Sequence, residues 1–156
     1  MNVVDDMQLL STHLDNALLS SELSRSIRET VFFSGLMVSP RLVDQIAHEM
    51  SSSFFLYFED RVDGTARVYG GSLAHQGLGP TTVLTACKTL ARVCREKSNP
   101  LKDLPEVAGS YMSALLEGYI EGREQKLLQE QERTLQAHLA AAVRQQREND
   151  RPVLDG

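Results

Sequence analysis

The chain of 156 residues has room for one domain with a single core, and its 42% hydrophobic and 24% charged residues are typical of a globular protein. A net charge of −5 excludes a general nucleic-acid surface, which requires concentrated Lys and Arg. No segment approaches the roughly 18 uncharged apolar residues of a membrane span, and the N-terminus lacks a basic signal-peptide start, so we expect a soluble, cytoplasmic protein without membrane contact.

Helix is predicted almost throughout, because Pro and Gly are rare and fall between segments of helical periodicity. In chain order, the apolar spacing predicts helices over residues 5–19, 21–33, 39–59, 65–76, 80–97 and 106–149. Asn16 and Ser20 are expected to separate the first two helices. Ser39-Pro40 and Pro80 each place a proline at the first position of a helix, which fixes where the third and fifth begin. The predicted fold class is all-α.

The last predicted helix is too long for the domain that contains it. At about 1.5 Å per residue it extends roughly 60 Å, about twice the width of a small domain, so it must project. Up to Ile120 it is apolar enough to be buried, whereas from Glu121 onward it is rich in Glu, Gln, Arg and Ala. There a narrow apolar stripe follows heptad spacing through Leu128, Leu135, Leu139, Ala142 and Gln146. A coiled-coil dimer explains this stripe best, and a solvated terminal helix is the alternative.

These boundaries divide the chain into a core at 1–120, a coiled-coil output helix at 121–149 and a tail or linker at 150–156. Cys87 and Cys94 lie seven residues apart on one helix, too far apart for a disulfide, and are expected to be reduced core residues. The histidines lie on different segments, and neither a phosphate-binding loop nor a converging nucleophile and base is visible. We therefore expect no metal site and no enzyme activity.

One local string resembles a known family. Residues 67–84, RVYGGSLAHQGLGPTTVL, are similar to the corner of globin-coupled sensor domains, in which a helix bearing the haem-ligating His is followed by a Gly-Leu type turn and Pro. The positions that match are Gly70, Gly77, Leu78 and Pro80. The family's His lies four residues before the Gly of the corner, where this chain has Leu73, and an apolar side chain cannot ligate iron. His75, two residues later, is rotated by about 200° around the helix.

A second string, residues 114–136, resembles the junction between globin and linker in the non-haem N-terminal globin domains of RsbR-type stressosome proteins. The resemblance implies a globin-like helical bundle that binds no cofactor. It implies a homodimeric sensory or regulatory domain that relays a signal through its C-terminal helix to an output domain or a stressosome-like partner. Two alternatives stay open, a haem-binding oxygen or redox sensor that uses His75 and a helical structural adaptor without a pocket.

Two sets of residues follow from the helix order implied by this resemblance. A ligand pocket is expected to be lined by His48, Phe54, Phe58, Leu73 and Cys87. The dimer face and output seam are expected to be formed by Met112, Leu116, Tyr119, Leu128, Leu135 and Leu139.

Overall fold

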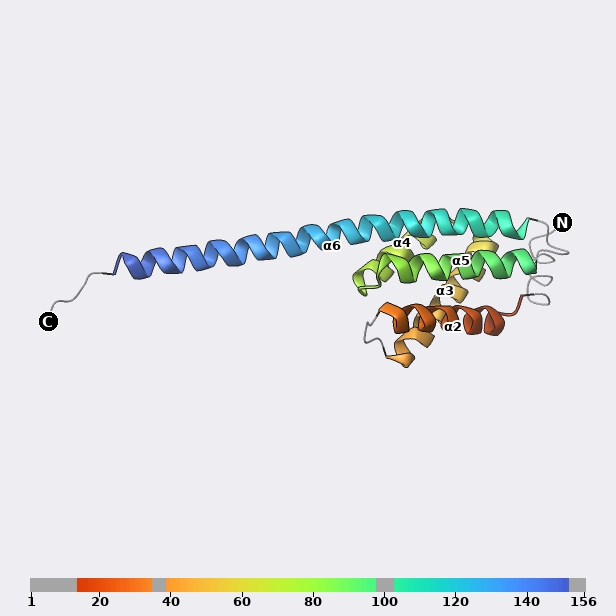
Figure 1. The fold of residues 1–156 in the computed structure, drawn as a ribbon. Coiled ribbons are helices and arrows are strands. Elements are labelled where there is room, and N and C mark those ends of the chain that lie inside the picture. The colour runs from red at the N-terminus through yellow and green to blue at the C-terminus, as the bar shows by residue number, and fades with distance from the viewer. Residues whose placement is uncertain (1–13, 35–38, 98–102, 152–156) are drawn as a thin grey trace.

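The computed structural model describes residues 14–34, 39–97 and 103–151, which are helical except for short connections. Its helices are α2 (Asn16–Ser34), α3 (Pro40–Asp60), α4 (Asp63–His75), α5 (Pro80–Glu96) and α6 (Leu104–Asn149) (Figure 1). The described residues contain no strand, so the all-α prediction is confirmed for this part of the chain.

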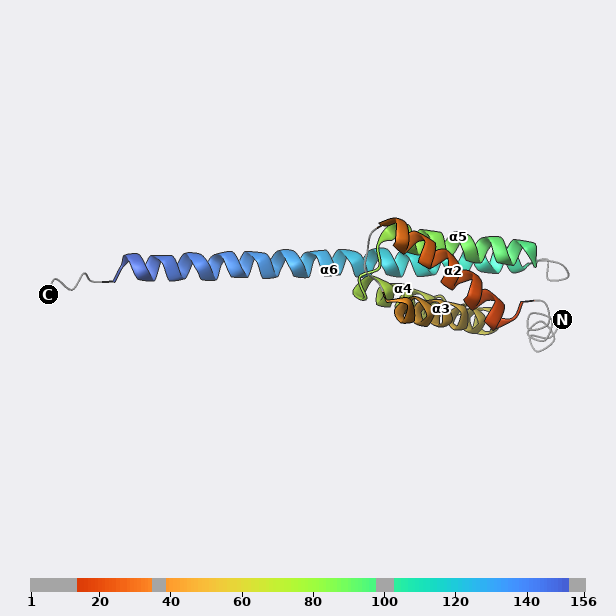
Figure 2. The same ribbon diagram turned by 60° about the horizontal axis from the view of Figure 1, so that its bottom comes forward.

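The helices form a short bundle from which one helix extends. α6 packs along α4 and also contacts α5, while α2 lies across α3 and α5 on the other side of the bundle (Figures 1 and 2). The first part of α6 covers the bundle, and its second part continues beyond every other helix as an isolated rod. The projection predicted for the last helix is therefore present.

Two helix starts agree with the sequence prediction. The Ser39 hydroxyl accepts a hydrogen bond from the Leu42 backbone N–H at 3.2 Å, and Pro40 occupies the first turn of α3. α5 begins at Pro80, directly after an extended Gly79. In both places a proline supplies the backbone angle of a first helical turn without needing a hydrogen-bond acceptor.

The break expected at Ser20, between helices 5–19 and 21–33, is wrong, because α2 runs through it without interruption. The Asp15 carboxylate accepts a hydrogen bond from the Ala17 N–H at 2.9 Å and begins the helix. Asn16 turns its side chain toward Ser51 of α3, with which it forms a hydrogen bond. The buried side chains Leu19, Leu23 and Ile27 then hold one continuous face against the bundle. Residues 5–13 of the predicted first helix lie outside the described residues.

α4 also differs from its predicted start. It begins at Asp63, two residues before the expected Thr65. α3 ends at Asp60 and is capped by Arg61, whose φ of 55° is left-handed and whose N–H donates to the Tyr57 carbonyl. The turn thus occupies Arg61 and Val62, and Asp63 and Gly64 belong to α4.

Aromatic side chains from α3 and α6 meet in the middle of the core. Tyr111 is fully buried, and its ring lies 5.4 Å from both Phe54 and Tyr57 between centroids. The Tyr111 hydroxyl is 3.4 Å from the Met50 carbonyl, and burial raises the pKa of Tyr111 well above its usual value. The core therefore has an aromatic centre, to which α3 and α6 both contribute.

α4 and α6 approach so closely that glycine backbone forms their contact. A Cβ atom on Gly70 would lie 1.9 Å from the Leu115 carbonyl oxygen, and one on Gly118 would lie 1.8 Å from the Arg67 carbonyl oxygen. At Gly122 the nearest neighbours of such an atom would be Gly71 and Ala74, at 3.0 and 3.1 Å. No residue with a side chain fits at Gly70 or Gly118 unless the helices separate.

Candidate functional site

The corner between α4 and α5 carries the string that suggested a family resemblance. We call residues 77–79 the corner. Gly77 has a φ of +87°, which a residue with a side chain rarely adopts. Its N–H bonds the Ala74 carbonyl at 3.0 Å, and the Leu78 N–H bonds the Leu73 carbonyl at 3.2 Å. These bonds end α4 and direct the chain into α5.

The corner is attached to α6 where that helix leaves the bundle. The Tyr119 hydroxyl donates to the Leu78 carbonyl at 2.6 Å, and Arg123 donates in turn to the Tyr119 oxygen at 3.2 Å. A cleft of about 320 Å³ lies between the corner and α6, and Lys126 and Leu127 form part of its wall. We call α6 residues 119–123 the exit, because they join the buried and exposed parts of the helix.

The contact between the corner and the exit was not predicted from the sequence. The signal for half of this contact was present, since Tyr111, Leu115 and Tyr119 follow one another at four-residue spacing on the buried face of α6. Its partner Leu78 lies 41 residues earlier in the chain. Periodicity within one helix does not reveal a partner so distant in sequence.

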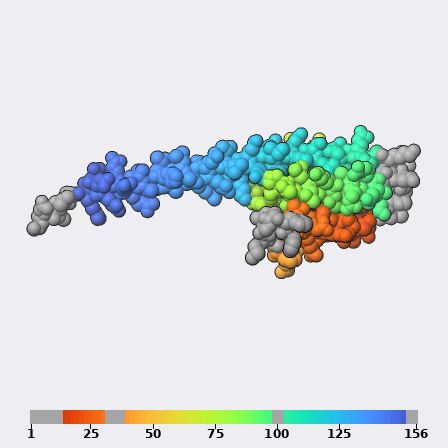
Figure 3. Space-filling model, in the orientation of Figure 1, coloured from red at the N-terminus to blue at the C-terminus, as the bar shows by residue number. Residues whose placement is uncertain are grey.

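Beyond the exit, α6 is exposed among the described residues, apart from a partly buried Lys126 beside the corner. Gly122 is its last buried residue, and we call residues 123–149 the stalk. The stalk is about 40 Å long at 1.5 Å per residue, and beyond its first turns it stands clear of the bundle in Figure 3. Leu128, Leu135 and Leu139 are 64%, 59% and 58% exposed, and Leu127 and Val143 are about half exposed.

The residues predicted for the dimer face and output seam lie on different sides of α6. A helix turns by about 100° per residue, so Tyr119 lies about 180° and Leu116 about 120° away from Leu128 around α6. Tyr119 is 3% exposed and belongs to the core, whereas Met112 and Leu116 are partly buried against that core. Tyr119 therefore has little surface left for a partner in this arrangement. Leu128, Leu135 and Leu139 do share one side of the stalk.

The residues expected to line a pocket are also divided. Phe54, Phe58, Leu73 and Cys87 come from three helices and lie buried in the common hydrophobic core. His48 is exposed and borders two surface hollows instead. The structure thus brings four of the five residues to the interior and leaves the histidine outside.

The histidine on α4 lies where its spacing predicts. Leu73 is fully buried and His75 is exposed, so the side of α4 that faces the core presents an alkyl group. Neither position offers an imidazole to the interior, and these residues do not fit an iron ligand of the kind found in sensor globins. Among the described residues, no three side chains of His, Cys, Asp or Glu are grouped closely enough to hold a metal ion.

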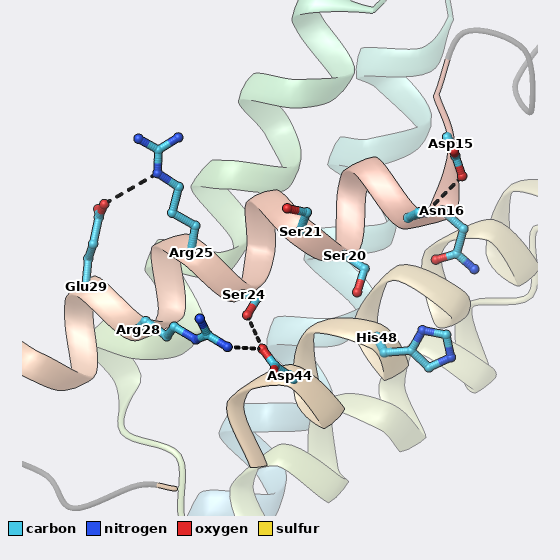
Figure 4. Close-up of a pocket in the computed structure, with 11 residues that line it drawn as sticks. Asp15, Asn16, Ser20, Ser21, Ser24, Arg25, Arg28, Glu29, Asp44 and His48 are labelled. Atoms are coloured by element: carbon cyan, nitrogen blue, oxygen red, sulfur yellow. Dashed lines mark hydrogen bonds and ion pairs between the residues drawn. The ribbon is translucent and has the colours of Figure 1, made fainter. Parts of the chain in front are cut away.

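A polar crevice of about 940 Å³ separates α2 from α3 (Figure 4). Ser24 and Arg28 both point at Asp44 across it, and the Arg28–Asp44 ion pair is 2.6 Å long. These two donors hold the pKa of Asp44 below its usual value, with the Ser24 hydrogen bond as the larger cause. Arg25 is likewise paired with Glu29 at 3.8 Å. Because these charged side chains are paired with one another, we interpret the crevice as part of the contact between α2 and α3 and not as a ligand site.

A second hollow, of about 510 Å³, lies between α3 and α4. Its apolar walls include Leu56 and Val68, which are 46% and 75% exposed. His48 and Glu49 form part of its rim. It is the more apolar of these two hollows.

The thiols of α5 are buried, as predicted. Cys87 and Cys94 are unpaired and at most 5% exposed, and burial raises their pKa values to about 11 and about 12. Both stay protonated and unreactive at neutral pH. This protonation does not fit covalent attachment of a ligand at Cys87, which requires a thiolate.

Within the described residues, no helix combines the length and the apolarity needed to cross a membrane. No family model, no curated protein and no solved structure matches the chain.

Proposed function

We propose that the chain is a non-enzymatic sensory or regulatory domain that acts as a homodimer and relays a signal through α6 to an output domain or partner. The observation that carries the proposal is the stalk. It is helical through Asn149, yet Leu128, Leu135 and Leu139 are each more than half exposed along one of its sides. An isolated helix with an exposed leucine stripe is marginal in water, and a partner helix would cover the stripe.

The connection between core and stalk supports a relay. The exit is bonded to the corner through Tyr119 and Arg123, and α6 continues without interruption from core to stalk. A change in the position of α4 or α5 therefore reaches the stalk through backbone contacts and these hydrogen bonds. For a ligand to use this path, it must bind two arrangements of the dimer with different affinities.

The input is proposed to act on the bundle. Phe54, Phe58, Leu73 and Cys87 remain our proposed surroundings for a small apolar ligand, supported by their shared place in an apolar interior. The resemblance to haem-free sensor globins stays part of this proposal. It is supported by the Gly77 conformation and by the alkyl side chain at Leu73.

Association of the full chain tests the proposal directly. We expect sedimentation equilibrium to give a dimer for the wild type and a monomer for the double variant Leu135→Asp with Leu139→Asp, because two carboxylates per copy would have to be buried in the seam. The matched control is Ala137→Asp with Ala141→Asp, which adds the same charge at the same spacing on the exposed opposite side of the stalk. We expect this control to remain dimeric.

Two outcomes count against the proposal. A wild-type chain that stays monomeric at high micromolar concentration would remove the homodimer and favour an adaptor that binds a different protein. Equal association of the two double variants would show that the leucine side of the stalk is not the contact.

A further inference from the structure

The stripe on the stalk contains one charged residue, which does not suit a coiled-coil seam. Leu128, Leu135 and Ala142 repeat every seven residues, and Leu139 lies four residues after Leu135, so they occupy d, d, d and a positions. The preceding a position, seven residues before Leu139, is Glu132. Glu132 is exposed in the structure and lies on the same side of the stalk as the leucines. A partner that covers the leucines must also cover this carboxylate.

The positions that flank the seam indicate what kind of partner covers it. The e and g positions from 129 to 145 carry no Lys, Arg, Asp or Glu, and are Gln129, Gln131, Gln136, His138, Val143 and Gln145. The charged side chains lie farther out, for example at Glu130, Arg133 and Arg144. Coiled coils of different chains select each other through charges at e and g. A flank without fixed charges lacks this means of selecting a different chain and places no like charges against each other, which suits a second copy of this chain.

The two possible orientations of a second copy treat Glu132 differently. In a parallel, in-register pair each residue meets its own equivalent, which gives three leucine layers, at 128, 135 and 139, and places the two Glu132 carboxylates in one layer. An antiparallel pair centred between Leu135 and Leu139 gives two leucine layers and places Glu132 opposite Ala142. The parallel pair thus buries more leucine against leucine but opposes two like charges.

Nothing on the stalk itself offsets this charge. The neighbours of Glu132 three and four residues away are Leu128, Gln129, Leu135 and Gln136, none of them cationic. The Gln136 amide nitrogen donates a hydrogen bond to the Glu132 carboxylate at 3.5 Å. Arg133 follows directly but occupies the outward b position. The carboxylate would therefore enter the seam with an amide as its neighbour and no counter-ion.

We infer that the second copy binds parallel and in register, and that the paired Glu132 residues form a like-charged layer that weakens this dimer. The inference rests on the proposed homodimer. The leucine layers set the partner and the register, whereas Glu132 keeps association weak enough to reverse when the core changes. A polar residue at a single a position is known to specify pairing at a cost in affinity.

Neutralisation of Glu132 at constant pH tests the inference. We expect Glu132→Gln to lower the dimer dissociation constant about tenfold, which corresponds to two charges a few ångströms apart at an interface of intermediate dielectric. Glu130→Gln is the matched control, because this residue carries the same charge at the outward f position. It should leave the dissociation constant within about twofold. Repulsion is screened by salt, so wild type should tighten between 20 and 300 mM NaCl more than Glu132→Gln does.

Orientation is measured separately with a spin label at Glu148→Cys, since Cys87 and Cys94 are buried. Labels on a parallel dimer lie side by side, whereas an antiparallel pair centred as above separates them by about 30 Å along the axis. Widely separated labels, or equal dissociation constants for Glu132→Gln and Glu130→Gln, would overturn the inference and leave the homodimer intact. A wild type and Glu132→Gln that are both monomeric would overturn the homodimer as well.

Discussion

Gly118→Ala should destabilise the bundle although it adds a single methyl group. The new Cβ would lie 1.8 Å from the Arg67 carbonyl oxygen, and 2.6 and 2.8 Å from the carbonyl carbon and Cα of the same residue. All three are backbone atoms of α4, so no side chain can rotate away. Non-bonded carbon and oxygen atoms approach to about 3 Å, and α6 must therefore move from α4 by at least about 1 Å.

The expected cost follows from that displacement. Overpacking of this kind costs about 1 to 3 kcal/mol. Where the separation opens a gap of about 1 Å between α4 and α6, the atoms that line the gap lose about a quarter to a half of their dispersion energy. Alanine returns about 1 kcal/mol because it is the better helix former. We expect a net loss of about 1 to 2 kcal/mol in the free energy of unfolding, because overpacking and lost dispersion together exceed the gain in helix propensity.

Gly109→Ala provides a matched control on the same helix. A Cβ at Gly109 would meet no atom within 4 Å, so the substitution should stabilise the chain by about 0.5 to 1 kcal/mol through helix propensity alone. Urea unfolding followed by tyrosine fluorescence measures both, since the chain has no Trp and Tyr111 and Tyr119 report on the core. Free energies of unfolding for the two variants within 0.5 kcal/mol of each other would refute the close-contact reasoning.

Two further predictions concern buried groups. Cys87 and Cys94 should react with a disulfide reagent at pH 8 only after denaturation, because burial raises both thiol pKa values above 9.0. The thiols of the unfolded chain ionise first, so the free energy of unfolding should keep its full value below pH 9 and fall as pH rises toward 11. Rapid labelling of the native protein, or a urea midpoint unchanged between pH 8 and 10.5, would contradict this. Tyr119→Phe should lower the free energy of unfolding by about 1 kcal/mol because it leaves the Leu78 carbonyl without its donor, and a urea midpoint equal to wild type would show that the bond contributes nothing.

The sequence predicted helix starts most accurately where a capping residue or a proline marks them. Ser39-Pro40 and Pro80 placed two helix starts correctly, because capping and proline geometry are decided within a few residues. The sequence prediction failed at α2. Asn16 and Ser20 suggested a helix end there, but packing of Leu19 and Leu23 maintains the helix. Tertiary burial outweighs the small intrinsic preference of a polar residue against helix.

The candidate site was less predictable than the fold. The stripe Leu128, Leu135 and Leu139 was visible because it repeats within one helix. Met112, Leu116 and Tyr119 were joined to it by chain proximity, although helical rotation turns them toward other sides. In the buried part of α6, the apolar residues lie where α4 and α5 contact the helix. In the stalk, the apolar residues lie only at heptad positions. The sequence alone does not indicate the residue at which packing against α4 and α5 gives way to the heptad repeat.

The glycine contact between α4 and α6 has a mechanical consequence. Backbone touches backbone at Gly70 and Gly118, with no flexible side chain between them to absorb movement. A tilt of α4 is therefore passed to α6 as a tilt rather than dissipated. The stalk then acts as a lever arm pivoting near Gly122, and a rotation of about 5° there carries the far end of an arm of about 40 Å through roughly 3 Å. At the Gly118 contact, four residues or about 6 Å from the pivot, the same rotation is a movement of only about 0.5 Å, so a small adjustment there becomes a several-fold larger displacement at the end of the stalk.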